Sequence, residues 1–221
     1  MEPFGLVIFD CDGVLVDSEV ITSRVFAAML NELGIPATVD EVFDKFVGRS
    51  MAQCLEEIAQ LLGREVPAEF ARQYHLRTAL ALESDLKTVP GIESALAEIR
   101  MPYCVASNGS HEKMQTTLGI TDLLPKFQGK LFSVTEVARG KPFPDVFLYA
   151  AAQSGVAPSA CAVIEDTPTG VTAGVAAGMT VYGYCAHTPA HHLIAAGAHH
   201  TFDCMSDLPA ILGNPRQSHH G

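Results

Sequence analysis

The chain has 221 residues, 48% of them hydrophobic, and a formal net charge of −11 at pH 7. This length and hydrophobicity are enough for one large globular domain, or for a domain with an insertion. The negative charge argues against nucleic acid or an anionic membrane as a partner, because binding there depends on Lys and Arg. No apolar run reaches the roughly 18 residues of a membrane-spanning helix, and no basic and apolar leader pattern is present, so we expect a cytoplasmic protein.

The six cysteines are scattered through the chain and form no CxxC pair. They are Cys11, Cys54, Cys104, Cys161, Cys185 and Cys204. Several lie in apolar, strand-like runs, which is typical of reduced thiols in a protein core and not of a disulfide framework. We therefore expect no disulfide bonds.

The first predicted element is a buried strand at residues 6–9, where an apolar run ends at two carboxylates. Asp10 and Asp12 follow the run, and Gly13 comes next. Because side chains alternate across a strand, the two carboxylates lie on the same side. Two close carboxylates repel each other unless a cation or a shared proton lies between them, which is the first indication of a metal. The alternative is that both aspartates only form a turn ahead of the glycine.

A helical region follows, from residue 19 to about residue 86. Apolar residues recur there at helical spacing, which predicts helices at about residues 24–33, 51–62 and 67–82. Gly34 and Gly63 end the first two of these helices. No part of this region has the pattern of a strand.

The pattern changes after residues 89–91 to alternating helices and strands. The predicted strands are residues 103–106, 131–133, 162–164 and 180–184, and the predicted helices are residues 92–99, 111–118, 145–153 and 169–177. Strands separated by helices indicate crossover connections and a parallel sheet. We therefore predict an α/β fold, a Rossmann-like doubly wound parallel sheet with an inserted all-helical cap domain. The catalytic core domain would comprise residues 1–17 and 87–221, and the cap domain residues 18–86.

Polar and charged side chains follow several of the predicted strands. Ser107 and Asn108 come after one strand, Glu165 and Asp166 after another, and Lys141 lies in a loop ahead of a helix. Ligands of such sheets bind beyond the carboxyl ends of the strands, so these groups should converge with the first two aspartates. Each group by itself has a plainer interpretation as a turn residue, an exposed loop lysine or a helix cap. Their joint occurrence at strand ends favours a site.

The residue types suit phosphoryl transfer. Asp10, Asp166 and Glu165 offer hard oxygen ligands, which favour Mg²⁺. Ser107 offers a hydroxyl donor and Lys141 a positive charge, and both kinds of group bind phosphate. One carboxylate can attack phosphorus while a second protonates the leaving oxygen, and the two aspartates after the first strand have that relation.

Four segments, DCDGVLVDSE, SNG, GKPFPD and EDTPTG, resemble in order and spacing the four motifs of the haloacid dehalogenase superfamily of phosphohydrolases. The resemblance covers nearly the whole chain, including a helical cap after the first strand, and its nearest subgroup is that of the β-phosphoglucomutase-like sugar-phosphate phosphatases. It implies a Mg²⁺-dependent phosphatase that hydrolyses small sugar or sugar-acid phosphates through an aspartyl-phosphate intermediate. We expect a small phosphorylated metabolite as the partner, and a monomer or a weak homo-oligomer.

The resemblance implies unequal roles for the acidic residues. Asp10 would be the nucleophile. Asp12 would be the general acid and then the general base for the hydrolytic water, with its backbone carbonyl also on Mg²⁺. Asp166 would bind Mg²⁺, and Glu165 would help to place the metal or its waters.

The resemblance also implies which groups hold the substrate. Ser107 and Asn108 would hold the transferring phosphoryl group, and Lys141 would bridge it to the nucleophile. In the cap, residues 48–50 resemble the substrate-specificity loop. Arg49 in that loop suits a second anionic group, such as the carboxylate of a sugar acid.

Departures from the family patterns narrow the reaction. Mutases of the subgroup carry a cap histidine where this chain has Thr22, which favours hydrolysis. Dehalogenases lack the second acid and need no metal, so Asp12 and Asp166 argue against them. Phosphonatases need a cap lysine, for which Lys45 is a candidate. Two further alternatives are a sugar-phosphate mutase of the same subgroup and a slow phospho-accepting or phosphate-binding module.

The histidines raise a different alternative. His187 and His191 lie four residues apart, as two zinc ligands on one helix can, but no acidic cluster lies near them in the sequence. We therefore expect both at the surface. The last residues, 217–221, have the composition of an unstructured tail.

Overall fold

The computed structural model describes residues 4–46, 49 and 51–213. The chain forms two compact units, one made of Met1–Val16 and Thr88–Gly221 and the other of Asp17–Lys87. We call them the α/β unit and the helical unit. Each border lies one residue from the border expected from the sequence.

The α/β unit is built on a parallel sheet of six strands in the order β3-β2-β1-β4-β5-β6. The strands are β1 (Leu6–Phe9), β2 (Tyr103–Ser107), β3 (Leu131–Ser133), β4 (Cys161–Glu165), β5 (Thr180–Tyr184) and β6 (His200–Phe202). Five of them lie where apolar runs predict strands. The sequence does not predict β6, because its three residues include a single apolar side chain.

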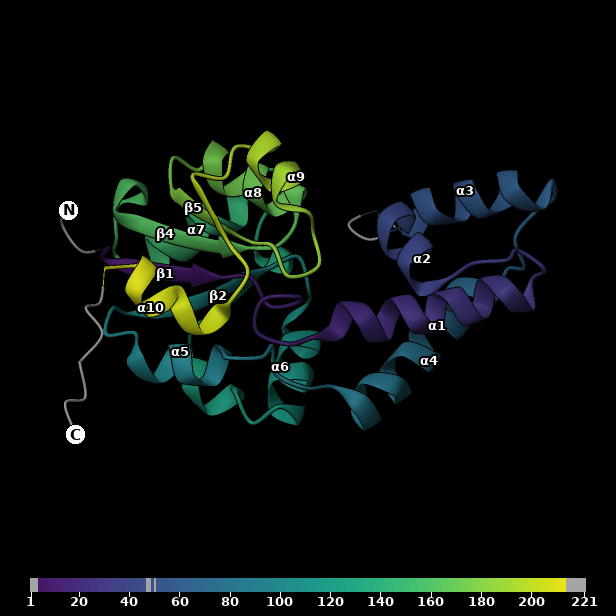
Figure 1. Ribbon diagram of the computed structural model, residues 1–221, viewed down its shortest axis with the longest axis horizontal. Helices are drawn as coiled ribbons and strands as arrows, with labels where there is room; N and C mark the ends of the chain where they lie inside the picture. Colours follow the sequence, from purple (N-terminus) through teal and green to yellow (C-terminus); the bar gives the residue numbers. More distant parts are fainter. Residues whose placement is uncertain (1–3, 47–48, 50, 214–221) are drawn as a thin grey trace. The chain divides into compact units, whose positions relative to one another are not determined.

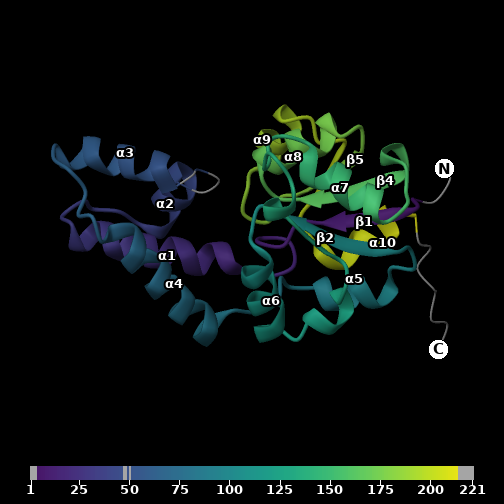
Figure 2. The same cartoon turned by 180° about the vertical axis from the view of Figure 1, so that it is seen from behind.

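Helices cover both faces of the sheet (Figures 1 and 2). On one side lie α7 (Asp145–Gln153), α8 (Pro168–Ala176) and α9 (Ala190–Ala195), and on the other α5 (Ile92–Glu98), α6 (His111–Ile120) and α10 (Leu208–Ile211). The predicted α/β class, a Rossmann-like doubly wound parallel sheet, is therefore confirmed.

The strand order reverses at β1. The chain runs outward from β1 through β2 and β3, and then returns to the other side of β1 to continue through β4, β5 and β6. Phe9 lies opposite Val105 of β2 and Ile164 of β4. Ligands of doubly wound sheets bind at such a reversal, beyond the carboxyl ends of the strands. The residues after Phe9 and Ile164 are therefore in the position expected for a ligand site.

Close packing of helices on the sheet fixes the central strands. Ile8 of β1 and Val163 of β4 are fully buried in one core cluster with Phe147 of α7. Gly174 brings α8 close to the sheet, because a Cβ at this position would lie 2.7 Å from Val181 Cγ2. The strands β1 and β4 are thus held in a tightly packed core.

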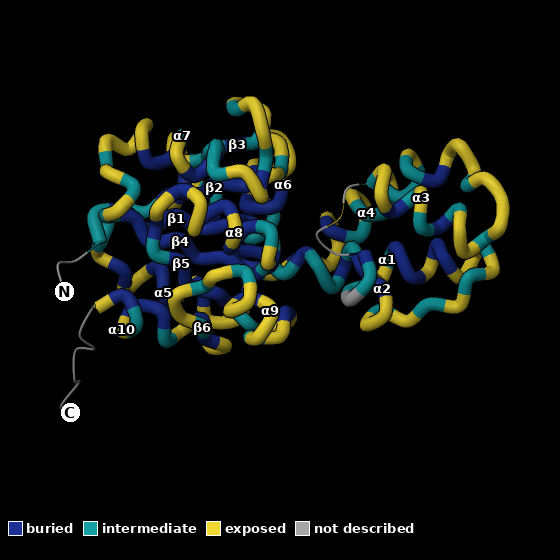
Figure 3. The backbone as a smooth tube through the Cα atoms, turned by 90° about the horizontal axis from the view of Figure 1, so that it is seen from above, coloured by how far each residue is buried: buried dark blue, intermediate teal, exposed yellow. Residues whose placement is uncertain are grey.

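The helical unit contains α1 (Ser18–Glu32), α2 (Val39–Phe46), α3 (Met51–Leu62) and α4 (Phe70–Asp85). Its aromatic core surrounds the Phe26 ring, whose centroid lies 4.9 Å from that of Phe46, 5.7 Å from Phe70 and 5.2 Å from Tyr74. Figure 3 shows buried backbone positions alternating with exposed ones along these helices. The sequence predicts α1, α3 and α4, but not α2, in which half of the residues are charged.

Among the described residues, no helix is long and apolar enough to cross a membrane. All six cysteines are free thiols, as expected from their spacing. The segment at residues 217–221, expected to be a tail, lies outside the described residues.

Candidate active site

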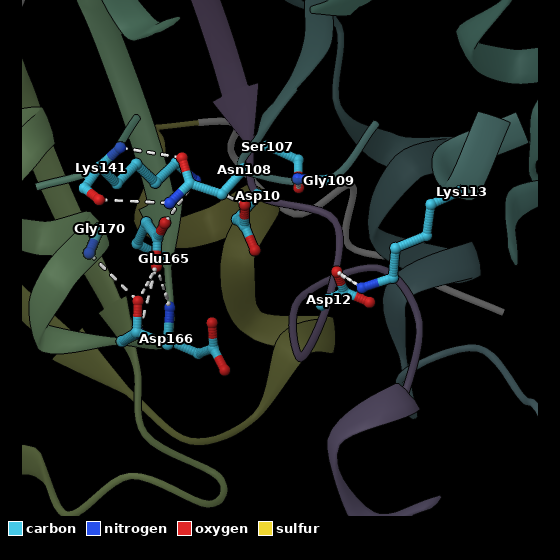
Figure 4. Close-up of polar contacts among 11 residues, drawn as sticks. Asp10, Asp12, Ser107, Asn108, Gly109, Lys113, Lys141, Glu165, Asp166 and Gly170 are labelled. Atoms are coloured by element: carbon cyan, nitrogen blue, oxygen red, sulfur yellow. Dashed lines mark hydrogen bonds and ion pairs between the residues drawn. The ribbon is translucent and has the colours of Figure 1, made fainter. Parts of the chain in front are cut away.

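The candidate site begins where β1 ends, at the reversal of strand order (Figure 4). Asp10 follows Phe9 directly, and its backbone N–H donates to the Ile164 carbonyl at 3.0 Å, which extends the pairing of β1 with β4. Its side chain is largely buried. The chain then turns at Gly13, whose φ of 73° is in the left-handed region that favours glycine. The turn keeps Asp12 close to the strand end.

Lys141 reaches the same point from the loop before α7. Its Nζ donates to Asp10 Oδ1 at 2.5 Å and to Glu165 Oε1 at 2.7 Å. Only 4% of the lysine side chain is exposed, and the ammonium lies 4.6 Å from the centre of the Phe147 ring. Burial lowers the pKa of Lys141, but the two carboxylates outweigh this effect and hold the pKa above its ordinary value. The ammonium therefore stays charged.

Glu165 fixes both Lys141 and the start of α8. While Oε1 accepts from the lysine, Oε2 accepts from the backbone N–H groups of Asp166 and Thr167 at 3.0 and 3.1 Å and from the Thr167 hydroxyl at 3.0 Å. Thr167 caps α8, because its Oγ1 accepts from the Gly170 N–H at 3.1 Å. A Cβ at Gly170 would lie 1.7 Å from Glu165 Oε1. The residue that caps the helix is thus Thr167, and not one of the two acids before it.

Three carboxylates at this point could share a metal ion. One oxygen from each of Asp10, Glu165 and Asp166 lies within 4.8 Å of the others, and all three residues are buried. Burial raises the pKa of Asp10, Lys141 lowers it, and the neighbouring carboxylates Glu165 and Asp12 raise it; together these effects bring the pKa of Asp10 to about 7. Lys141 supplies one positive charge against three carboxylates, so a divalent cation would balance the excess. An all-carboxylate donor set fits the Mg²⁺ expected from the sequence.

Gly13 leaves room for one of these carboxylates. A Cβ at Gly13 would lie 2.1 Å from Asp166 Oδ2. The glycine therefore serves two purposes, since it adopts the positive φ of the turn and also lets Asp166 approach the strand end. The sequence shows this glycine only as part of a turn.

The loop after β2 lies beside the loop that carries Lys141. Ser107 is buried, and its Oγ accepts from the Gly109 N–H at 3.0 Å, so the hydroxyl can still donate to another acceptor. The Asn108 side chain binds the backbone of Lys141. Its Oδ1 accepts from the Lys141 N–H at 2.8 Å, and its Nδ2 donates to the Lys141 carbonyl at 3.3 Å.

Lys113 is a residue of the site that sequence reasoning missed. Its Nζ donates to Asp12 Oδ2 at 2.6 Å, and 44% of the lysine side chain is exposed against 22% of the aspartate side chain. Burial lowers the pKa of Lys113, but the Asp12 carboxylate outweighs this and raises it. The available signal was a lysine in the first turn of α6, directly after the β2 loop. The structure thus gives Asp12 its own cation, distinct from Lys141.

Two other expected features concern Arg49 and the histidines. Arg49 belongs to the helical unit, where its Nη1 lies 3.7 Å from Glu57 Oε2, and Gly48 and Ser50 lie outside the described residues. In the part of the chain that the structure describes, the residue groups able to share a metal include no histidine. The zinc alternative for His187 therefore receives no support.

Comparison with known proteins supports the resemblance. The family model of haloacid dehalogenase-like hydrolases matches residues 4–178. The chain is 35% identical over 212 residues to 6-phosphogluconate phosphatase of Escherichia coli (strain K12), covering 96% of each protein. It is 30% identical over 191 residues to β-phosphoglucomutase of Bacillus subtilis (strain 168), covering 80% of this chain and 81% of that protein.

A solved structure shows the same fold. It is that of a conserved haloacid dehalogenase-like protein of unknown function from Agrobacterium tumefaciens, with a TM-score of 0.89 and 36% identity, and the match covers 95% of this chain and 97% of that one. The expected likeness to the β-phosphoglucomutase-like subgroup, and within it to bacterial 6-phosphogluconate phosphatase, is confirmed. Since the family model extends over well more than half of its length, the chain belongs to the haloacid dehalogenase-like hydrolases and is an enzyme of that family.

Proposed function

We propose that this chain is a Mg²⁺-dependent phosphatase that hydrolyses a small sugar or sugar-acid phosphate through an aspartyl-phosphate intermediate. The observation that carries the proposal is the Asp10 carboxylate, buried at the end of β1 and bonded to the Lys141 ammonium, with Asp12 two residues further on. A buried carboxylate held by a lysine is placed to attack, and a second carboxyl nearby can move the proton that the reaction requires.

In the first step, an Asp10 oxygen forms a bond to phosphorus while the bond from phosphorus to the sugar oxygen breaks. Asp12, in its protonated form, gives its proton to that leaving oxygen. Lys141 and the Ser107 hydroxyl bind the phosphoryl oxygens, where negative charge accumulates. When bound by Asp10, Asp166 and the Asp12 carbonyl, Mg²⁺ would supply positive charge to the same oxygens.

In the second step, the Asp12 carboxylate removes a proton from water. The water oxygen bonds to phosphorus, and the bond from phosphorus to Asp10 breaks, which releases inorganic phosphate and restores the carboxylate. Lys113, 2.6 Å from Asp12 Oδ2, holds this carboxylate in one orientation through both steps. Glu165 keeps Lys141 in place through its Oε1.

The proposed substrate class rests on a relative and on the helical unit. Because the E. coli protein named 6-phosphogluconate phosphatase is 35% identical over nearly the full length, 6-phosphogluconate is the first substrate to test. We propose that the helical unit acts as the cap, with Arg49 as the partner of the sugar-acid carboxylate. A cytoplasmic location and a monomer or weak homo-oligomer are further parts of this proposal.

Thr22 favours hydrolysis over a mutase reaction. Its Oγ1 donates to the Glu19 carbonyl at 3.0 Å within α1. A threonine hydroxyl is not a base near neutral pH, so it cannot take a proton from a sugar hydroxyl as the histidine of the mutases can. Water is then the remaining acceptor of the phosphoryl group.

A phosphate-release assay tests the proposal. We expect steady, multiple-turnover release from 6-phosphogluconate, hexose phosphates or p-nitrophenyl phosphate with Mg²⁺, loss of that release with EDTA, and recovery when excess Mg²⁺ is added. A single release per enzyme molecule would favour the slow phospho-accepting module. Conversion of a sugar phosphate into its isomer without release would favour the mutase, and no reaction with any of these compounds would refute the phosphatase.

Asp10→Asn tests the nucleophile. An amide oxygen is a much poorer nucleophile than a carboxylate, so we expect the rate to fall by more than about 100-fold and no phosphoenzyme to form. The measurement is phosphate release together with intact-protein mass after an acid quench. A variant that keeps more than about a hundredth of the wild-type rate would exclude Asp10 as the nucleophile.

A further inference from the structure

Both polar atoms of the Asn108 carboxamide bond to a second loop of the site (Figure 4). Oδ1 accepts from the Lys141 N–H at 2.8 Å, and Nδ2 donates to the Lys141 carbonyl at 3.3 Å. The two bonds involve both backbone polar groups of Lys141, which lies outside any helix or strand. Both polar atoms of the Asn108 side chain thus point to the Lys141 backbone, although the family resemblance implies that Asn108 holds the phosphoryl group.

Gly140 provides a second, independent observation. A Cβ at Gly140 would lie 2.8 Å from Asn108 Oδ1 and 2.8 Å from Val134 Cγ2, closer than real Cβ contacts come. The φ of Gly140 is not in the left-handed region, so backbone conformation does not call for glycine here. The available space calls for it, because a side chain here would displace the Asn108 carboxamide and the Val134 side chain, or move the loop that carries Lys141 away from them.

The two bonds to the Lys141 backbone matter because the side chain of the same residue binds the carboxylates of the site. Its Nζ reaches two carboxylates at once, Asp10 at 2.5 Å and Glu165 at 2.7 Å. A shift of the peptide would carry the ammonium away from the position where it binds both. A displacement of about 1 Å in a catalytic group can cost roughly 100-fold in rate.

We propose that Asn108 and Gly140 form a clamp that positions Lys141, so that the Asn108 side chain acts through the lysine and not on the phosphoryl group itself. Asn108 is in this view a positioning residue. The glycine permits the close approach, and the carboxamide fixes the loop. The kinetic test of the clamp rests on the proposed phosphatase function, whereas its structural test does not.

The kinetic test compares Asn108→Ala, Gly140→Ala and the double variant. Each single change is expected to lower kcat by roughly 10- to 100-fold while KM changes by less than about 3-fold. Both changes release the same loop, so their effects should not multiply. The kcat of the double variant should be no more than about 3-fold below that of the less active single variant. Gly119→Ala is the matched control, since its Cβ would meet only Leu124 Cδ2, at 4.0 Å, and wild-type rates are expected.

Two kinetic outcomes would overturn the clamp. If the losses of the two single variants multiply in the double variant, Asn108 acts on the substrate separately from the loop. If Gly140→Ala keeps wild-type kcat, the close contact at Gly140 has no bearing on Lys141.

The structural test measures hydrogen exchange at the Lys141 backbone amide, which needs no activity. The amide should be protected in the wild type and in Gly119→Ala, and should exchange at least about 10-fold faster in Asn108→Ala and Gly140→Ala. Unchanged exchange in both variants would refute the clamp even if the chain is a phosphatase. Faster exchange in a chain that releases no phosphate would refute the phosphatase and leave the clamp in place.

Discussion

The two units of the molecule differ in how far they bury charged side chains. In the α/β unit, four charged residues at the ends of β1 and β4 and in the loop before α7 are at most 9% exposed. They are Asp10, Lys141, Glu165 and Asp166. In the described part of the helical unit, ion pairs such as Arg24–Asp85, Arg77–Glu32 and Lys45–Glu57 leave more than a quarter of every side chain exposed.

The difference in burial has an energetic cost. Removing a carboxylate or an ammonium from water costs several kcal/mol, and a buried pair seldom regains more than it loses, so buried ion pairs are weak evidence for stability. Pairs at the surface are worth about 0 to 1 kcal/mol. This supports the proposal that the buried group serves the chemistry, whereas the charges of the helical unit can change with little effect on the fold.

The largest effect after that of the nucleophile is expected at Asp12. Asp12→Asn removes the proposed proton carrier, and we expect a loss in kcat of about 10² to 10⁴, the usual contribution of general acid–base catalysis. The loss should be larger for a sugar phosphate than for p-nitrophenyl phosphate, because nitrophenolate leaves without a proton. Asp122→Asn is a matched control at an exposed position with a φ of 58°, which Asn tolerates. Equal losses on both substrates would contradict the role of Asp12 as the acid.

A smaller effect of the same kind is expected at Lys113. Lys113→Met removes the donor at 2.6 Å from Asp12 Oδ2 but leaves the carboxyl in place, so the carboxyl loses its fixed orientation and a neighbouring positive charge. We expect roughly a 10-fold lower rate on sugar phosphates and less than about 3-fold on p-nitrophenyl phosphate, measured as kcat. Lys126→Met, at an exposed lysine, should behave as wild type. A uniform loss on all substrates would show that Lys113 does not act through Asp12.

The sequence predicts best what is local. The apolar runs that end in Asp10 and Glu165 mark buried strands and the acids beyond them, and the reversal of strand order then brings the acids together. Weak elements are missed because their signals come from their neighbours: β6 has three residues and exists by pairing with β5, and α2 buries Val42 and Phe46 among many charges.

Contacts between distant loops are what the sequence does not reveal. Asn108 and Lys141 are 33 residues apart, and Asp12 and Lys113 are 101 residues apart. Nothing in the local pattern says that a carboxamide will bind one particular peptide, or that a lysine in the first turn of α6 will face the β1 end. Such contacts depend on packed geometry, so a motif can name a residue without giving its role, as it does for Asn108.

In the helical unit, the expected effects depend on the substrate. Arg49→Ala should raise KM for 6-phosphogluconate by roughly 10-fold and change KM for a neutral sugar phosphate by less than about 3-fold, because a lost pairing with a carboxylate affects only a substrate that has one. The control is Arg72→Ala, an exposed arginine of α4 that pairs with Glu69. Equal changes for both substrates would remove Arg49 as the partner of a second anion.

The smallest effect is expected at Arg77. Its Nη1 lies 2.6 Å from Glu32 Oε1 and joins α4 to α1, but both side chains are about half exposed, so water and salt screen the pair. For Arg77→Ala we expect wild-type kcat and KM, and a Tm within about 2 °C of wild type by calorimetry. A large fall in Tm would show that surface pairs hold the helical unit together. The charged pairs of the two units would then differ only in how far they are exposed to solvent, since the pairs of the helical unit would stabilise the fold.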